Sequence, residues 1–500
     1  MAVIRLAIDP MLAATHGPEV DWTWRTLLTG IGYAWQQVAP GEPCDIAYVR
    51  DPASVAAALA IRANPDAWAH AADLRLAGGS RADGLVCLRF AGEPVVRDLV
   101  TRSDGRLVCD RDLILDAFWL ATGQGEAHMP RVAHGFFDLE QSPLVTDGLL
   151  REAVASSIGR ALERWLCDAG HPPPLSRWPA GRRLAVCAGH DVDYPDAVPG
   201  LEPLRQLVQR GPAALAPAWD LLVGRRHHWH FQSWVDLEAG LGLRSAFYFC
   251  AAPGSLVRRA RGTPDPFYDI RTPRFRDLFR ALRDQGVEVG LHASYRACER
   301  PDAIAGEKAA LEEAAGAVVD GNRHHYWRLH PHDPDATLRL HALAGLTYDA
   351  SLAHDRYLGW RRGFSWPFFP FDRAARQPLA TLQLPTAWMD DQVFRLSRFN
   401  GGGADQQLEA LALRVADHGG CLMVDVHEYV FDDTLYPGWA ATYRTLLTRL
   451  AARSDVWFAR PIDVARHWIS RAASIAAASH GLDGRTRPAP GAGTGGMVNP

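Results

Sequence analysis

From about residue 182 onward, short apolar runs alternate with longer stretches in which apolar residues recur at helical spacing. The apolar runs predict strands at 184–187, 245–249, 287–291, 326–329, 346–348, 382–384, 421–426 and 456–458. Helices are expected between them, for example at 275–282, 407–418 and 442–453. Repeated strand–helix–strand units predict a parallel sheet, either doubly wound or closed. Seven or eight strands favour closure into a barrel.

The first 150 residues predict a smaller α/β domain. Apolar runs at 46–49 and 84–88 are typical of strands, and 112–120 has the pattern of an amphipathic helix. This part of the sequence carries no grouping of residues that indicates a reaction.

A bridge is expected between the two domains, over 151–181. It contains the end of a helical pattern at 149–167 and the proline-rich stretch 170–175. The barrel domain is then expected over 182–471. The tail 472–500 is rich in Ala, Ser, Gly and Pro, which predicts disorder.

Composition narrows the class of protein. The 500 residues are 48% hydrophobic and 22% charged, with a formal net charge of −4, so no overall basic field indicates a nucleic-acid partner. The apolar runs are too short to predict a membrane span, and the first residues lack the pattern of a secretion signal. The eight cysteines contain no CxxC pair and are expected to be mostly buried thiols in a reducing compartment. A cytoplasmic location is therefore expected.

Polar residues follow several of the expected strands. Asp191 and Asp193 end the first one in the stretch VCAGHDVDYPD, and alternation along a strand places both carboxylates on one face. Two carboxylates that close repel each other unless a cation or a proton lies between them. His292 follows the strand at 287–291. Asp425 and His427 share a face at the end of the strand at 421–426, so Asp425 is expected to orient His427.

The densest group of histidines lies in the stretch GNRHHYWRLHPHD, residues 321–333, which holds four of the chain's twenty histidines. Imidazole suits zinc and related metals. Because the chemistry of a parallel barrel collects at the carboxyl ends of its strands, these groups are expected to meet there. Together they have the composition that a metal-assisted hydrolase needs.

At these motifs the chain resembles the polysaccharide deacetylase family, the NodB-homology deacetylases, in its branch whose first motif reads HDVD. The resemblance covers roughly 182–468. The motifs that carry it are HDVD at 190–193, GLHASY at 290–295, RHHYWR at 323–328, AGLTYD at 344–349, GWRRG at 359–363, PFFPF at 367–371 and VDVH at 424–427.

This resemblance implies a distorted (β/α) barrel and removal of acetyl groups from carbohydrate with the help of a divalent metal ion, expected to be zinc, with cobalt or nickel as alternatives. It implies that Asp191 is the catalytic base, that Asp193 and His292 are metal ligands, that Arg323 orients the base, and that His427 is the general acid.

The chain departs from the family's pattern at two places. Typical members carry a second metal-binding histidine four residues after the first, where this chain has Arg296. We therefore expect His325 as the third ligand, with His330 and His332 as alternatives. In typical members the two aspartates are adjacent, whereas Val192 separates them here. The opposite assignment therefore stays open, in which Asp193 is the base and Asp191 is the metal ligand.

The expected substrate is an acetylated sugar, such as a precursor of surface polysaccharide. Tyr295, Trp327 and Trp360 are candidates for contacts with it, although each is also compatible with simple packing. Two other functions remain open. The chain can be a carbohydrate-binding or assembly protein that has lost the metal, or a metal-independent glycoside hydrolase that uses Asp191 and Asp193 as its acid and base.

Overall fold

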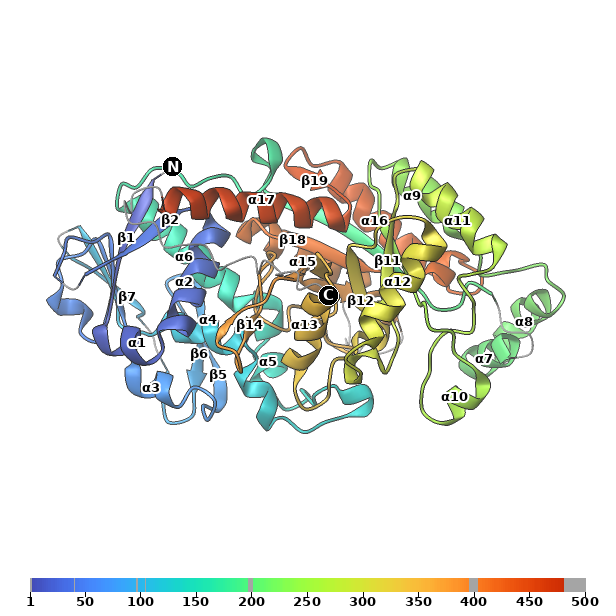
Figure 1. Cartoon of the computed structure of the whole chain (residues 1–500), viewed down its shortest axis with the longest axis horizontal. Helices are drawn as coiled ribbons and strands as arrows, with labels where there is room; N and C mark the ends of the chain where they lie inside the picture. The colour runs from blue at the N-terminus through green and yellow to red at the C-terminus, as the bar shows by residue number, and fades with distance from the viewer. Residues whose placement is uncertain are drawn as a thin grey trace, which may run out of the picture.

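The computed structural model describes residues 2–39, 41–95, 98–103, 105–196, 201–394 and 403–480. The molecule is elongated (Figure 1). The N-terminal part lies at one end, the barrel occupies the middle, and three short helices lie at the other end. These are α7 (Leu201–Arg210), α8 (Leu215–Leu222) and α10 (Leu256–Ala260). In the part of the chain that is described, no helix is both long and apolar enough to cross a membrane.

The N-terminal part contains a six-stranded sheet in the order β2-β1-β3-β4-β8-β7. All neighbours pair in parallel except β7 with β8. The strands are β1 (Val3–Ile8), β2 (Ala34–Val38), β3 (Ile46–Val49), β4 (Leu59–Arg62), β7 (Val100–Ser103) and β8 (Arg106–Cys109), with a separate hairpin of β5 (Leu76–Ala82) and β6 (Leu85–Phe90). This sheet confirms the expected α/β character of the region.

The second sheet closes into a distorted barrel. Its strands are β9 (Leu184–Val192), β10 (Ala246–Phe249), β11 (Glu288–Ala293), β12 (Gly321–His324), β13 (Tyr348–Asp349), β16 (Leu382–Gln383), β17 (Thr386–Met389), β18 (Cys421–Asp425) and β19 (Val456–Phe458). The order is β16-β13-β12-β11-β10-β9-β18-β17, and every pairing is parallel.

The two ends of this order are neighbours along the chain. Only Leu384 and Pro385 separate β16 from β17. One interrupted length of chain therefore pairs with β13 on one side and β18 on the other, which closes the sheet. β19 pairs with the first residues of β9, on the same side on which β10 pairs with the later residues of β9. The fold class expected from the sequence is thus confirmed by the strand pairing itself.

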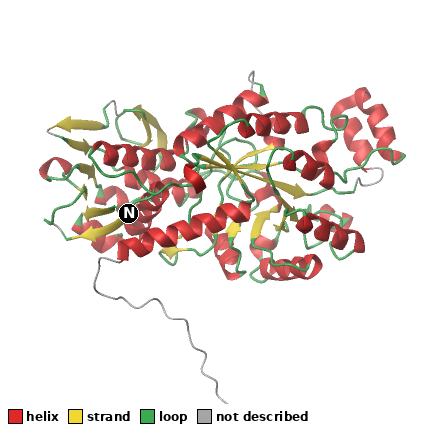
Figure 2. Cartoon of the chain, turned by 90° about the horizontal axis from the view of Figure 1, so that it is seen from above, coloured by secondary structure: helices red, strands yellow, loops and turns green. Residues whose placement is uncertain are grey.

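Helices surround the strands of the barrel (Figure 2). They are α9 (Phe231–Ala239), α11 (Pro273–Asp284), α12 (Ala303–Ala315), α13 (Pro334–Leu343), α15 (Ala404–His418) and α16 (Trp439–Ala451). The last helix, α17 (Pro461–His480), packs on both β9 and β2, so it runs from the barrel to the N-terminal sheet (Figure 1).

Two expectations from the sequence are wrong. The expected strand at 326–329 does not form. The strand here is β12, which ends at His324, and a 3₁₀ turn follows it. Residues 472–480 continue α17 as a helix, because Ala and Ser there permit helix and Ile475 is buried. The rest of the expected disordered tail, from residue 481, lies outside the described residues.

The N-terminal part and the barrel share one hydrophobic core. The indole of Trp366, from the barrel, lies against Gly30 of α2 (Gly17–Ile31) and Gly159 of α6 (Val154–Asp168). A Cβ atom at either glycine would come within 2.7 Å of that indole. The ring also belongs to the same buried cluster as residues of both sheets. The expected bridge helix is therefore part of the packed core.

A buried ion pair joins the same two parts. The guanidinium of Arg361 donates two hydrogen bonds to the carboxylate of Glu126, at 2.9 and 3.0 Å, and Arg362 donates a third at 3.3 Å. Burial would raise the pKa of Glu126, but the two arginines lower it to about 2. Removal of this carboxylate would leave the buried Arg361 without its anionic partner and Arg362 with only Asp335, at 3.9 Å.

We expect Glu126→Gln to lower the free energy of unfolding by about 3 kcal/mol, because a buried pair that loses one partner is strongly destabilised. Chemical denaturation of the full chain measures this change. The exposed pair Arg449–Glu409 provides the control, since Glu409→Gln should change stability by less than about 1 kcal/mol. Equal effects of the two substitutions would contradict the structural role of Glu126.

Candidate active site

The inner face of the barrel collects polar groups at the carboxyl ends of its strands. Side chains alternate along a strand, so Cys187, Gly189 and Asp191 face inward while Val186, Ala188 and His190 face the surrounding helices. Two separate clusters of buried apolar residues confirm this division. Cys187 belongs to the inner cluster, which is shared with the N-terminal part, and Val186 and Ala188 belong to the outer cluster, which includes residues of the surrounding helices.

His190 accordingly lies outside the site. Its Nδ1 is 2.9 Å from the carbonyl oxygen of Val426, and its Nε2 is 2.9 Å from the carboxylate of Glu238 on α9. The ring stacks on Phe247. Both ring nitrogens therefore have partners, and the histidine of the HDVD stretch holds β9 against α9.

The structure brings together Asp193, His292 and His325. One ligand atom from each lies within 4.8 Å of those from the others, and all three side chains are buried. Nε2 of His292 is 3.3 Å from Oδ1 of Asp193, and Nε2 of His325 is 3.6 Å from Oδ2. These are the three residues expected from the sequence as metal ligands.

The donor atoms of this group fit a cation. Nδ1 of His292 lies 2.8 Å from the carbonyl oxygen of Arg323, which only accepts hydrogen bonds, so Nδ1 carries the proton. Nε2 of His292 then presents a lone pair to Oδ1 of Asp193. Both atoms are buried and neither has a hydrogen-bond partner. Two facing lone pairs at this distance repel each other unless a cation or a proton lies between them. Imidazole and carboxylate are ligands that zinc accepts.

A second carboxylate supports His325. Oδ1 of Asp265 lies 3.4 Å from Nδ1 of His325 and also accepts a hydrogen bond from the backbone N–H of Tyr295 at 2.7 Å. Burial would lower the pKa of His325, but Asp193 and Asp265 raise it to about 9. Burial would likewise raise the pKa of Asp193, whereas His325, His292 and His427 hold it well below its usual value.

Asp191 is held by Arg323 at the centre of the barrel. The guanidinium is fully buried and donates to Asp191 at 3.0 Å, and it pairs with Asp425 at 2.9 Å. It also lies over the ring of Tyr248, 4.5 Å from its centroid. Gly189 permits this arrangement, since a Cβ atom there would lie 2.4 Å from Tyr248 and 3.0 Å from the guanidinium.

His427 takes its orientation from a residue that the sequence did not indicate. Nδ1 of His427 donates to Oδ1 of Asp390 at 2.8 Å, and the backbone N–H of His427 donates to Oδ2 at 2.8 Å. The expectation that Asp425 orients His427 is wrong, because Asp425 pairs with Arg323 instead. Asp390 follows β17, whose apolar run Ala387–Trp388–Met389 was the signal that could have revealed it.

Two of the expected sugar contacts belong to the core. Trp360 is 1% exposed within the outer cluster, and Trp327 is 2% exposed against Phe136. Tyr295 is also buried, and its hydroxyl pairs with His134 Nδ1 at 3.0 Å. None of the three therefore offers a free face to a substrate, because each ring already packs against the protein.

The exposed aromatic ring beside the site is that of Tyr326, which the sequence analysis did not single out. It is 38% exposed and lies 4.7 Å from the ring of His325 and 4.4 Å from that of His134. Tyr326 and Trp327 both have positive φ angles, of 60° and 47°. Such backbone is costly for side chains of this size and is often found at functional sites. The tight turn directs His325 inward and Tyr326 outward.

Three other residues near these motifs do not join the cluster. Arg296, at the position where the family carries its second histidine, is exposed. His330 receives the backbone N–H of Asp333 on its Nδ1 at 3.1 Å, and the ring of His332 lies 6.3 Å from that of His330. Of the alternatives for a third ligand, only His325 lies beside Asp193 and His292 within the described residues.

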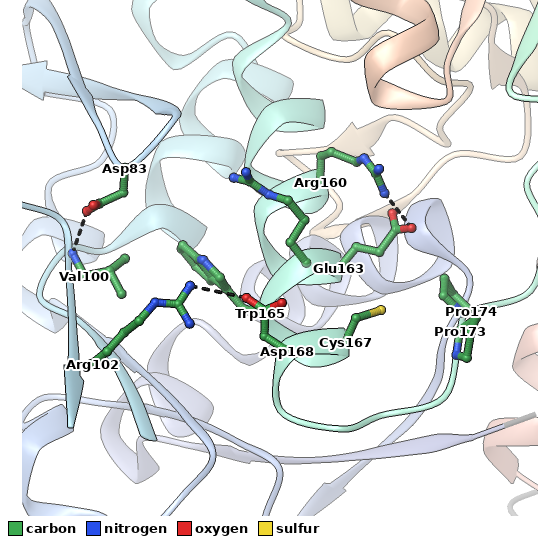
Figure 3. Close-up of a pocket in the computed structure, with 11 residues that line it drawn as sticks. Asp83, Val100, Arg102, Arg160, Glu163, Trp165, Cys167, Asp168, Pro173 and Pro174 are labelled. Carbon is green, nitrogen blue, oxygen red and sulfur yellow. Dashed lines mark hydrogen bonds and ion pairs between the residues drawn. The ribbon is translucent and has the colours of Figure 1, made fainter. Parts of the chain in front are cut away.

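A separate cavity lies between the β7–β8 hairpin, α6 and the proline-rich linker (Figure 3). Its volume is about 710 Å³, and ion pairs between Arg102 and Asp168 and between Arg160 and Glu163 line it. None of the site residues expected from the sequence lines this cavity. It does not contribute to the arrangement at the barrel.

The search of family models found no match, and no curated protein matched. Solved structures did match. One is a "probable Polysaccharide deacetylase from Pseudomonas aeruginosa PAO1", at 19% identity over 60% of this chain and 96% of that chain, with a TM-score of 0.39. Another is Puue allantoinase, at 18% identity over 60% of this chain and 95% of that chain, with a TM-score of 0.39. At these values the likenesses carry no conclusion about activity. The strand pairing establishes the fold, and the distances between the side chains establish the cluster of Asp193, His292 and His325.

The three-residue cluster leads to a prediction about metal content. We expect the purified chain, supplied with zinc, to retain about one ion per molecule. His292→Ala and His325→Ala should each reduce this content at least tenfold, because each removes one of three ligands. Elemental analysis after gel filtration measures it.

Arg296→Ala is the matched control, since it changes the position that carries a ligand in the resembled family but is exposed here. It should retain the metal. Retention of metal by His325→Ala with loss in His292→Ala would show that the third ligand lies elsewhere.

Proposed function

We propose that the chain is a metal-dependent carbohydrate deacetylase, which hydrolyses the amide bond of an acetamido sugar to release acetate. The proposal rests on the arrangement of five side chains. Asp193, His292 and His325 form the ligand cluster, and Asp191 and His427 both lie beside it. Asp191 Oδ2 is 3.9 Å from Nε2 of His292, and His427 Nε2 is 3.7 Å from Oδ2 of Asp193. A base and an acid thus border the same three ligands.

Asp193, His292 and His325 would hold the ion. A divalent ion bound there would polarise the acetyl carbonyl and lower the pKa of a water molecule. Zinc is the proposed ion, because its usual ligands are imidazole and carboxylate, with cobalt or nickel as alternatives.

Asp191 would act as the general base. It would accept a proton from the water whose oxygen attacks the carbonyl carbon of the acetyl group. Its hydrogen bond from Arg323 fixes the carboxylate, so its free oxygen faces the ligand cluster. The geometry therefore favours Asp191 as the base and Asp193 as the ligand.

His427 would act as the general acid. When the carbon–nitrogen bond breaks, its Nε2 would give a proton to the leaving nitrogen, so that an amine and acetate result. Burial would lower the pKa of His427, but the carboxylates of Asp390 and Asp193 raise it well above its usual value. The ring is thus kept protonated and ready to donate.

The same charges disfavour a glycoside hydrolase that uses Asp191 and Asp193. Such an enzyme needs one carboxyl group with a raised pKa to protonate the leaving oxygen. The pKa of Asp193 is instead held well below its usual value by three imidazoles, although burial opposes them. Asp191 already accepts a hydrogen bond from the guanidinium of Arg323.

The test measures acetate release from oligosaccharides of N-acetylglucosamine and from nucleotide-linked acetamido sugars, with zinc present and after chelation. We expect release that chelation abolishes and zinc restores. Asp191→Asn should lower kcat at least about 10³-fold and leave the metal content unchanged, because it removes the base and not a ligand.

Other outcomes would identify the alternatives. Reducing sugar released without acetate, and unaffected by chelation, would support a glycoside hydrolase. Binding of sugar with neither metal nor product would support a binding protein.

The position of Asp390 leads to a prediction about pH. A general acid must be protonated to act, so activity should fall as pH rises through the pKa of His427. Asp390→Asn removes a charge that raises this pKa. The alkaline limb of the kcat/KM profile should therefore move to lower pH, by about one unit or more. An alkaline limb that stays in place while zinc content is unchanged would exclude His427 as the acid.

A further inference from the structure

The loops that follow β9 and β10 build a small helical lobe with an unusual surface. We define the docking lobe as residues 201–226 and 255–262, which contain α7, α8 and α10 and form the end of the molecule opposite the N-terminal sheet (Figure 1). Large apolar side chains that are at least 44% exposed gather there: Leu204, Val208, Leu215, Trp219, Leu222, Val223, Leu256 and Val257. These eight are more than half of the exposed large apolar residues in the described chain.

Helical spacing places the apolar side chains on common faces. On α8, Leu215, Trp219 and Leu222 follow the i, i+4, i+7 pattern of one helix face, while Pro217 and Leu221 on the other side are buried. On α7, Leu204 and Val208 lie one turn apart. Trp219 is 58% exposed, whereas the sixteen other tryptophans, all described, are buried or half-buried. An exposed apolar face of this kind indicates a site that binds another molecule or a membrane.

The lobe is also strongly basic. It carries seven arginines and only two acidic residues, Glu202 and Asp220, for a formal charge of +5 in a chain whose net charge is −4. Two of these arginines, Arg226 and Arg258, pair with Asp432 and Asp265 outside the lobe. Arg225 pairs with Asp220 at 3.5 Å but keeps a 71% exposed side chain, and Arg261 is exposed too. Apolar side chains, an exposed tryptophan and surrounding arginines are the composition of helices that lie in the interface of an anionic bilayer.

We propose that the docking lobe binds the surface of an anionic phospholipid bilayer, with the exposed face of α8 inserted among the headgroups and the arginines paired with lipid phosphates. The charge decides against a second copy of the chain as the occupant. A symmetric dimer through this face would place two lobes of +5 against each other.

The lobe adjoins the candidate active site. The guanidinium of Arg205, on α7, lies over the rings of Tyr194 and Tyr429, at 5.4 and 5.9 Å from their centroids. Tyr194 follows Asp193 directly, and the ring of Tyr429 is 5.4 Å from that of His427. Docking of the lobe therefore brings the mouth of the barrel close to the membrane surface. This binding does not depend on the proposed reaction, so each can fail without the other.

The test is co-sedimentation of the full chain with vesicles of 30% phosphatidylglycerol in phosphatidylcholine, and with vesicles of phosphatidylcholine alone. We expect binding to the anionic vesicles that weakens as salt is raised. Trp219→Ser with Leu222→Ser, and separately Arg225→Gln with Arg261→Gln, should each weaken it at least about tenfold.

Matched controls lie on other faces. Leu343→Ser removes an apolar side chain that is 80% exposed on α13, and Arg280→Gln with Arg466→Gln removes two exposed arginines. Both should bind as the wild type does, and all variants should keep its melting temperature. The proposal is overturned if the wild type stays in solution with anionic vesicles, or if both lobe variants bind as well as it does. It is also overturned if light scattering shows a dimer that Trp219→Ser with Leu222→Ser converts to monomer while vesicles bind nothing.

Discussion

The buried guanidinium of Arg323 is the charge around which the carboxyl end of the barrel is arranged. It has no exposed surface, and its partners Asp191 and Asp425 come from two neighbouring strands. A cation in such a place is costly unless it is paired. The backbone carbonyl oxygen of Arg323 also fixes the proton of His292 on Nδ1. One residue therefore sets both the position of Asp191, the proposed base, and the direction in which the lone pair of His292 faces Asp193.

The N-terminal part is bound into this arrangement. It shares a hydrophobic core with the barrel around Trp366, and its His134 pairs with Tyr295 and stacks beside Tyr326 at the mouth. Residues far from the barrel motifs in sequence thus shape the entrance to the site. The lobe of α7, α8 and α10 lies at the end of the molecule opposite the N-terminal sheet (Figure 1), and its Arg205 contacts Tyr194 and Tyr429 beside the site.

Most of the barrel and the central residues of the site could be predicted from the sequence, because apolar strands that end in Asp or His leave a local signal. Asp265 could not, since only a tertiary contact places it beside His325. Asp390 follows an apolar run, but its pairing with His427 is likewise a tertiary contact. β12 was displaced in the prediction because its residues are polar. Nε2 of its outward-facing His324 lies 2.8 Å from Nε2 of His341, a contact that an apolar pattern does not reveal.

The inward-facing residues carry a consequence for how such a chain can change over evolution. At the end of three strands the paired site residues are two positions apart, the first on the strand and the second just past it: Asp191 and Asp193, Arg323 and His325, Asp425 and His427. A single inserted or deleted residue between the members of a pair would turn one of them toward the helices, because neighbouring positions face opposite sides. The site therefore depends on the spacing inside each pair as much as on the identity of its members.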